Sequence, residues 1–327
     1  MPSLKEIKTR IGSVKNTLKI TSAMKLVSSA KLHKAQMAIE GMLPYSQRLE
    51  AMLRDIKLSE KFNVQGSKEQ GILLPSLERG RVESPQKTIT LVAISSSTSL
   101  CGAFNHNLIR HTQQLINDYQ AQGLHVLLIP IGRKVAQAFS TTHNLQVDDS
   151  YVQIGEKPLY AQASALSSHL TDLYQRGQVQ RVELLYTHYK NIAVQVLTHN
   201  QFLPIEEEVQ SPKKEEEEKK SVTSACPVSS VIKESSEQTI SSGVTSYILE
   251  PTPSELILTL YPRVLAVRLF ATLLDSSAAE HAARSFAMQQ ATDNAEMLLQ
   301  ELNLQYNKVR QQSITNELLD IVGGTLR

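Results

Sequence analysis

A loop of small residues is the part of the chain whose composition best suits the binding of an anion. Residues 95–102 read SSSTSLCG, follow an apolar run and precede a predicted helix, so backbone N–H groups at the helix start could face a phosphate. The loop has neither the G-x-G-x-x-G nor the G-x-x-x-x-G-K-[ST] spacing that holds nucleotide phosphates. The sequence therefore favours a tight strand-to-helix turn here over a nucleotide site.

The other reactive side chains form no catalytic pattern. Cys101 is a candidate nucleophile with His106 as its base, but no acidic partner accompanies them, so we expect a buried structural cysteine. Cys226 has no second cysteine or histidine at ligand spacing, which argues against a zinc site and against a disulfide switch. The pair Asp148 and Asp149 is typical of an exposed loop. We therefore expect no catalytic residue, no metal site and no cofactor.

A long helix at the start of the chain is the first element that must position these residues. Ser3 and Glu6 have the spacing of a capping box, and Pro44 is expected to kink or interrupt the helix, which then continues to about residue 58. Apolar residues recur in steps of three and four, the spacing of a coiled coil, and a phase shift is expected after residue 18. The stripe consists of Leu4, Ile7, Ile11, Val14 and Leu18, followed by Ile20, Met24 and Val27.

A second long helix is predicted at the C-terminal end. Residues 263–322 contain no glycine or proline, so a continuous helix there would be about 90 Å long, with Gly323 and Gly324 as its stop. A domain of this size cannot cover such a helix, so we expect part of it to protrude or to insert into a partner. Its stripe consists of Met288, Ala291, Ala295, Leu298 and Leu302, continued by Tyr306, Val309, Ile314, Leu318 and Ile321.

The charge distribution suggests that the two helices lie against each other. Residues 1–40 contain eight Lys and Arg against two acids, and residues 275–322 contain seven acids against three bases. The net charge of the 327-residue chain is only +2 and it contains no Trp, which argues against a nucleic-acid partner. A nucleic-acid-binding protein that uses the basic first helix is the distant runner-up. No run of about 18 apolar residues is present, so no transmembrane span is expected.

Between the helices the pattern alternates between short apolar strands and helices, which predicts a small α/β domain with a mainly parallel sheet. The predicted strands are Thr88–Ser95, Leu124–Ile131, Val182–Tyr186 and Ala193–Leu197, and the predicted helices are Asn107–Gln120, Arg133–Thr141 and Tyr160–Gly177. The predicted fold class is α/β, with a long antiparallel coiled coil of N- and C-terminal helices plus a central Rossmann-like α/β domain. A small Rossmann-like enzyme is another interpretation, but the sequence lacks the nucleotide-binding fingerprint that such an enzyme needs.

Four segments are predicted along the chain. They are an N-terminal coiled-coil helix (1–58), the α/β domain (86–205), an acidic, serine-rich mobile insertion (206–241), and a return segment with the C-terminal coiled-coil helix (242–327). Residues 1–35 are basic and poor in acids, as in a transit peptide, but their heptad spacing and capping box favour a helix of the mature protein.

Both ends of the chain resemble the γ subunits of F-type ATP synthases. The resemblance is carried by residues 5–8 (KEIK), 11–17 (IGSVKNT), 19–27 (KITSAMKLV), 287–295 (AMQQATDNA) and 304–311 (LQYNKVRQ), and by the shorter matches 100–102 (LCG) and 247–251 (YILEP). It spans nearly the whole chain, and the two terminal blocks are highly specific.

The resemblance implies a non-catalytic rotor shaft that couples proton flow through a membrane ring of c subunits to the catalytic sites on β. The implied partners are the hexameric head of α and β subunits, the ε subunit and the c ring, with membrane association only through the complex. The basic first helix suits an acidic lever segment of β. Without a transit peptide, the expected location is the cytoplasmic side of a bacterial plasma (inner) membrane. Positions implied to meet the stator are Met24, Lys25, Arg263, Gln289, Thr292 and Asp293.

Three departures from the family pattern stand out. Ser97, Thr98 and Ser99 replace an acid, a base and a glycine before the Leu-Cys-Gly match, and residues 266–268 (AVR) replace a more polar run. The insertion 206–241 resembles in its placement the regulatory loop of chloroplast γ subunits but lacks their cysteine pair. We therefore expect a surface loop that damps rotation.

Overall fold

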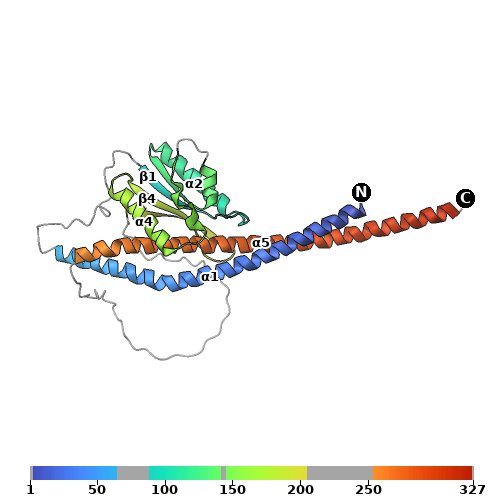
Figure 1. The fold of residues 1–327 in the computed structure, drawn as a ribbon, viewed down its shortest axis with the longest axis horizontal. Coiled ribbons are helices and arrows are strands. Elements are labelled where there is room, and N and C mark those ends of the chain that lie inside the picture. The colour runs from blue at the N-terminus through green and yellow to red at the C-terminus, as the bar shows by residue number, and fades with distance from the viewer. Residues whose placement is uncertain (1–2, 65–87, 141–144, 205–252, 326–327) are drawn as a thin grey trace, which may run out of the picture.

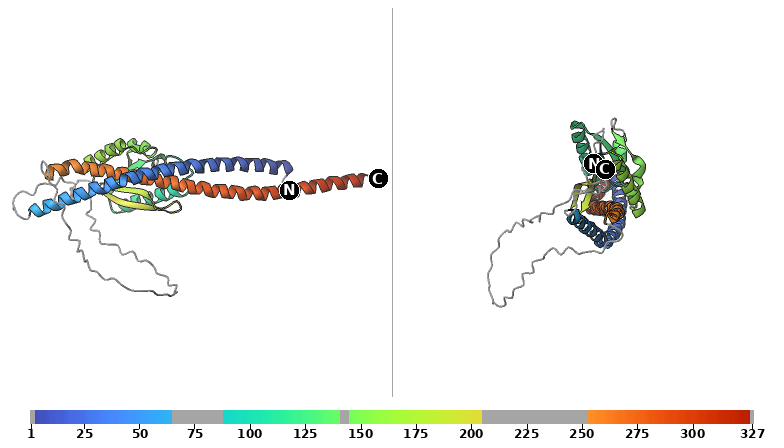
Figure 2. Two further views of the ribbon diagram at one scale, coloured as in Figure 1. Left: turned by 90° about the horizontal axis from the view of Figure 1, so that it is seen from below. Right: turned by 90° about the vertical axis from the view of Figure 1, so that its left-hand side faces the viewer.

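The computed structural model describes residues 3–64, 88–140, 145–204 and 253–325, and the predicted insertion 206–241 and Cys226 lie outside them. Two long helices, α1 (Leu4–Val64) and α5 (Pro253–Thr325), form a shaft, and an α/β domain packs against one side of it (Figure 1). The C-terminal part of α5 extends past the start of α1, as Figures 1 and 2 both show. The predicted architecture is confirmed, with the chain's two ends brought together around the domain between them.

Helix α1 begins as predicted and runs further than predicted. The Ser3 N–H donates to Glu6 Oε2 at 3.1 Å and the Glu6 N–H donates to Ser3 Oγ at 3.3 Å, which confirms the capping box. Of the kink or interruption expected at Pro44, the interruption is wrong, because α1 continues through this residue to Val64. A proline removes one helical hydrogen bond, and the buried residues Leu49 and Leu53 beyond it anchor the helix on the core.

Helix α5 is also longer than the sequence indicates. It starts at Pro253, where a missing N–H costs nothing, passes through Pro262, and includes Gly323 and Gly324 instead of stopping at them. Its 73 residues span about 110 Å. Within its described part an 18-residue window has a mean hydropathy of 1.6, enough for a membrane span by length and composition, contrary to our expectation. Half of that window is buried inside the fold, against α1, α4 and the sheet.

The α/β domain is a five-stranded sheet with helices on both faces. The strands are β1 (Thr88–Ile94), β2 (His125–Ile131), β3 (Gln146–Val147), β4 (Arg181–Tyr189) and β5 (Gln195–Leu203), in the order β3-β2-β1-β4-β5. All neighbouring strands are parallel except β4 and β5, which form an antiparallel pair. The helices are α2 (Phe104–Ala121), α3 (Arg133–Phe139) and α4 (Tyr160–Gln175), with a 3-10 turn η1 (Asp149–Gly155). The predicted strands and helices are confirmed, and β3 and η1 were not predicted.

Two cores flank the central strands. Leu91 and Ala93 of β1 face α2 and α3, whereas Val92 and Ile94 face the core that contains α4 and α5. Because β1 and β2 are covered on both faces, their sequences are continuous apolar runs without alternation. Helix α5 thus serves both as half of the shaft and as a covering helix of the sheet.

A carboxylate inside the sheet fastens the edge strand β5. Glu183 of β4 is 3% exposed and accepts hydrogen bonds from Tyr119 OH at 2.6 Å and His199 Nε2 at 2.8 Å, with Arg181 at 3.5 Å. Burial alone raises the pKa of Glu183, but the hydrogen bonds from His199 and Tyr119 and the charges of His199 and Arg181 outweigh it and leave the pKa below its usual value. The ionised carboxylate is therefore favoured by folding.

We predict that Glu183→Gln lowers the free energy of unfolding of the chain by about 1–3 kcal/mol at pH 7. A depressed folded pKa gives stability that is present above the unfolded pKa and lost as the pH falls through the folded pKa. The difference between wild type and variant in denaturant unfolding should therefore shrink between pH 7 and pH 3. Glu156→Gln, which removes an exposed ion pair with Arg133, is the control and should change stability by about 0–1 kcal/mol. A difference that grows toward low pH would contradict the assignment.

Candidate functional site

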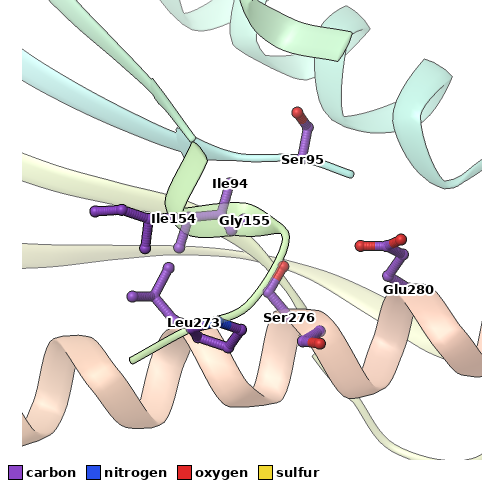
Figure 3. Close-up of a pocket in the computed structure, with 9 residues that line it drawn as sticks. Ile94, Ser95, Ile154, Gly155, Leu273, Ser276 and Glu280 are labelled. Carbon is purple, nitrogen blue, oxygen red and sulfur yellow. The ribbon is translucent and has the colours of Figure 1, made fainter. Parts of the chain in front are cut away.

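Two spaces lie near the carboxyl ends of the central strands. The strand order puts the switch point between β1 and β4, where open α/β sheets bind ligands at the carboxyl ends of the strands. There the loop after β1, the start of α2, β4, β5 and α5 line a cavity of about 270 Å³, and the described residues that line it include no charged side chain to hold a phosphate. Figure 3 shows the second space, at the end of β1, which α5 closes with Leu273 and Ser276 facing Ile94, Ile154 and Gly155.

The polar groups of the loop after β1 form hydrogen bonds with one another and with the start of α2. Asn105 accepts from the Ser96 N–H at 3.1 Å and donates to Ser96 Oγ at 2.7 Å and to Cys101 Sγ at 3.0 Å. Leu100 and Gly102 adopt φ values of 69° and 59°, which turn the chain tightly into α2. Cys101 is 2% exposed, so the predicted buried structural cysteine is confirmed. Among the described residues no three or more His, Cys, Asp or Glu side chains cluster to hold a metal ion.

The contact between α1 and α5 is the most extensive in the molecule, and its α1 side is an unbroken heptad pattern. The buried or half-buried positions follow steps of four and three: Ile7, Ile11, Val14, Leu18, Thr21, Lys25, Ser28, Leu32 and Ala35. The expected phase shift is wrong, because Ile20 and Val27 are 60% and 56% exposed. The seam keeps its phase by using polar residues, which a search for apolar residues alone overlooks.

On α5 four of the predicted stripe positions are exposed. The seam consists of Met288, Thr292, Ala295, Leu299, Leu302, Tyr306 and Val309, all buried or half-buried. Leu298, which was predicted to lie in the stripe, is 50% exposed. Ile314, Leu318 and Ile321, which were predicted to continue the stripe, are also exposed, at 46–63%.

Hydrogen bonds between side chains fix how the two helices meet. Thr292 Oγ1 donates to Thr21 Oγ1 at 3.0 Å, and the hydroxyls of Ser29 and Ser285 are 2.9 Å apart. Residue numbers rise along α1 as they fall along α5, so the helices are antiparallel, as predicted. We call these two contacts the hydroxyl pairs.

A buried ion pair within α5 lies just before the free part of the shaft begins, and its arginine reaches the α/β domain. Arg284 NH2 lies 2.8 Å from Glu280 Oε1 and donates to Thr98 Oγ1 at 2.7 Å, and both charged side chains are about nine-tenths buried. Burial raises the pKa of Glu280 although Arg284 and Lys31 lower it, and burial followed by the charge of Arg284 lowers the pKa of His281 to about 4. Thr98, one of the three residues that replace the family's acid, base and glycine, is thus the loop's hydrogen-bond acceptor for the shaft.

A second clamp holds the end of β4 to both helices. Asp275 of α5 accepts from the Tyr189 N–H at 3.0 Å and lies 2.6 Å from His188 Nδ1. Gln36 of α1 donates to Tyr189 OH at 2.9 Å. The domain is therefore fixed to the shaft by polar contacts with both helices, and no sequence pattern points to these contacts.

Five of the six predicted contact positions come together at mid-shaft. Thr21 pairs with Thr292, so Met24 and Lys25 of α1 lie close to Gln289 in the same antiparallel register. Gln289 Nε2 donates to Asp293 Oδ1 at 2.7 Å; Asp293 is exposed and Gln289, Met24 and Lys25 are half-buried. Thr292 is different, because its side chain is buried between the helices.

Arg263 is separate from this group. It is exposed and lines a groove with Met42, Tyr45 and Tyr160 beside the domain, 26 residues, or about 39 Å, along α5 from Gln289. Any partner of Arg263 must therefore contact a different part of the molecule from the partner at mid-shaft.

The free part of the shaft exposes more apolar surface than a monomer normally leaves in water. On α1 the exposed residues are Ile20, Leu26 and Val27, and on α5 they are Met297, Leu298, Leu304, Ile314, Leu318, Leu319, Ile321 and Val322, each at least 46% exposed. A long antiparallel helix pair of this kind, joined to a domain whose loop after β1 lacks a nucleotide-binding fingerprint, defines a class of protein: the shaft subunit of a larger assembly.

The comparisons with known proteins give the family. A model of the ATP synthase family matches residues 3–326. The ATP synthase gamma chain of Bacteroides thetaiotaomicron is 44% identical over 330 residues, covering 100% of both chains, and that of Flavobacterium johnsoniae is 37% identical over 99% of this chain and 98% of its own. A chain from the central stalk and c-ring structure of the Tetrahymena thermophila mitochondrial ATP synthase has the same fold, with a TM-score of 0.50, 20% identity, and coverage of 83% of this chain and 99% of its own.

The chain belongs to the ATP synthase gamma chain family. It is a subunit of ATP synthase, a membrane-associated complex, in which it forms the rotor shaft.

The buried ion pair gives a prediction for the junction of shaft and domain. Arg284→Ala leaves the Glu280 carboxylate buried without its partner and should lower the free energy of unfolding by about 3–5 kcal/mol at pH 7. Because burial raises the pKa of Glu280, protonation relieves the penalty, so the variant should recover stability as the pH is lowered to 5. Denaturant unfolding measures both effects.

The control is the double variant Glu280→Leu/Arg284→Met, which removes both charges and keeps the volume. It should unfold within about 1–2 kcal/mol of wild type and show no such recovery. Equal losses in the single and double variants would show that the pair acts through packing alone.

Proposed function

We propose that the chain is a non-catalytic shaft that couples proton flow through a c-subunit ring to conformational change at catalytic sites on β subunits, for ATP synthesis and hydrolysis. The observation that carries the proposal is the free part of α5, which continues beyond the start of α1 and exposes Leu318 and Leu319 at 57% and 63% (Figure 1). A helix with this surface needs a surrounding apolar sleeve, and the central cavity of an α/β hexamer would provide one.

The charge of α1 supports a partner of opposite sign. Lys5, Lys8, Lys15 and Lys19 are exposed along the free part of the shaft, and Lys25 follows at its edge. An acidic lever segment of β would be attracted to this surface as it passes, and the attraction would be strongest where water is excluded. A shaft with a basic and apolar face differs from side to side, so each β subunit meets a different surface at each angle.

The mid-shaft group provides specific contacts for that lever. We assign rotor–stator contacts to Met24 and Lys25 on α1 and to Gln289 and Asp293 on α5, with Thr292 acting on them through the pairing of the helices. Arg263, about 39 Å away, would contact a partner at the foot of the shaft. There the α/β domain would bind the ε subunit and the c ring, and the polar contacts of Arg284 and Asp275 would transmit torque from domain to shaft.

The proposed location is the cytoplasmic side of a bacterial plasma (inner) membrane, reached through the complex and without a membrane segment of its own. The bacterial sources of the similar gamma chains support it. The insertion 206–241, outside the described residues, is proposed to damp rotation, and its deletion should raise the rate of ATP hydrolysis. An unchanged rate would remove this regulatory role.

Co-purification from membranes tests the proposal. A tag on the exposed surface of the α/β domain should recover α, β and ε subunits with ATPase activity, identified by mass spectrometry. Recovery of the chain alone or with nucleic acid would overturn the proposal and favour a binding protein that uses the basic residues of α1.

The tip of α5 gives a prediction for coupling. Leu318→Ser/Leu319→Ser removes two apolar contacts, each worth about 1.5–3 kcal/mol when fully buried, and should lower the number of protons pumped per ATP hydrolysed in membrane vesicles. The matched control Leu318→Met/Leu319→Met keeps the apolar surface and should pump as wild type does. Equal coupling in both variants would show that the tip needs no apolar sleeve.

A further inference from the structure

The middle of the shaft has a polar seam where the rest of the seam is apolar. The α1 positions 21, 25 and 28 are Thr, Lys and Ser, with Thr21 and Ser28 8% and 3% exposed, while Ile7 before them and Leu32 after them are buried apolar residues. Apolar side chains would bury more area at these positions, so the polar residues cost stability. These polar residues lie next to the Glu280–Arg284 ion pair, where the contact between the shaft and the domain ends. They therefore need a role that offsets the lost stability.

The hydroxyl pairs can distinguish one alignment of the helices from its neighbours. An antiparallel coiled coil repeats every seven residues, so a slip of one helix by a heptad keeps apolar residues facing each other elsewhere in the seam. In the observed register Thr21 meets Thr292 and Ser29 meets Ser285. A slip of seven residues on α5 would place Thr21 against Leu299 and Ser29 against Thr292 in one direction, or Thr21 against Ser285 and Ser29 against Ala278 in the other. Either slip replaces the two observed pairs by one hydroxyl pair and leaves the other α1 hydroxyl against an apolar residue, so only the observed register makes two pairs.

The donors and acceptors of the first pair can be assigned. Thr21 Oγ1 donates to the Leu18 carbonyl at 3.0 Å, which leaves its lone pairs free to accept the proton of Thr292. That single proton is shared between Thr21 Oγ1 at 3.0 Å and the Met288 carbonyl of its own helix at 2.8 Å. Both hydroxyls thus have polar partners although the two side chains are buried between the helices.

We propose that the hydroxyl pairs Thr21–Thr292 and Ser29–Ser285 are the register key of the shaft: positioning residues that select one axial alignment of α1 on α5. Register determines which α1 residues stand beside which α5 residues on the outer surface. A one-heptad slip moves Met24 about 10 Å along the axis away from Gln289 and separates the mid-shaft contact group. The consequence for coupling rests on the proposed rotor function, whereas the selection of register does not.

Disulfide cross-linking of the full-length chain tests the register directly. In a background with Cys101→Ser and Cys226→Ser, the heptad register brings Ile11 opposite Leu302, and the two one-heptad slips bring it opposite Ala295 or Val309. Three cysteine pairs therefore report three alignments: Ile11→Cys with Leu302→Cys, with Ala295→Cys, or with Val309→Cys. With the hydroxyl pairs intact we expect the first pair to cross-link and the other two to cross-link many-fold less.

Removing the hydroxyls should allow alternative registers without lowering the stability of the helix pair. Thr21→Val/Thr292→Val/Ser29→Ala/Ser285→Ala keeps the side-chain volumes close to the original, so the melting temperature should stay the same or rise while the slipped pairs cross-link several-fold more. Thr21→Ser/Thr292→Ser, which retains the hydroxyls, should restore the single register. A control exchange of apolar seam residues, Leu32→Met with Ile39→Leu, should change packing but leave the register single.

Two outcomes would overturn the inference. In the first, the two slipped cysteine pairs cross-link as rarely in the variant without hydroxyls as in the parent. In the second, they cross-link equally often in that variant and in the control exchange Leu32→Met with Ile39→Leu. Assembled complexes carrying the same variants then report coupling, as protons pumped per ATP hydrolysed. Register loss with unchanged pumping would refute the link to coupling and leave the register key standing. Failure of the chain to co-purify with an ATPase would instead refute the rotor function and leave the cross-linking result intact.

Discussion

The packing of α1 against α5 is the constraint on which the rest of the molecule depends. It joins segments more than 200 residues apart in sequence and brings both ends of the chain to one axis, so the α/β domain between them has to lie beside that axis. The same α5 helix covers one face of the sheet, and its Leu273 and Ser276 close the space at the end of β1. The shaft therefore decides where the domain lies.

The shaft changes character along its length. Beside the domain the seam is apolar and continuous with the main core, through residues such as Leu53 and Leu265. At the junction it becomes polar, with the hydroxyl pairs and the Glu280–Arg284 ion pair close together. Beyond the start of α1, α5 has no second helix beside it among the residues that the structure describes, and it exposes apolar residues. These three zones correspond to attachment to the domain, alignment of the helices, and insertion into a partner.

Buried charge is concentrated where parts of the molecule must be held in a defined orientation. Glu183 fastens the edge strand, Arg284 fastens the loop of Thr98 to the shaft, and Asp275 fastens the end of β4. Each such group has few alternative partners in a low-dielectric surrounding, so it penalises a misplaced geometry more than an apolar contact does. A shaft that transmits torque needs stiff joints of this kind, since apolar surfaces can slide.

The sequence by itself determined the presence of the two terminal helices, the strands of the sheet, the capping box and the family, because periodicity, composition and local hydrogen bonding act over a few residues. It did not determine the phase of the seam. Ile20, Val27 and Leu298 fit an apolar stripe as well as Thr21, Ser28 and Leu299 fit the real one, and the choice depends on which residues of the other helix stand opposite. It also did not show that α1 continues through Pro44, or that Thr98 and Tyr189 are fastened to the shaft. These features arise from contacts between residues far apart in sequence, whose energies exist only once the tertiary structure has brought them together.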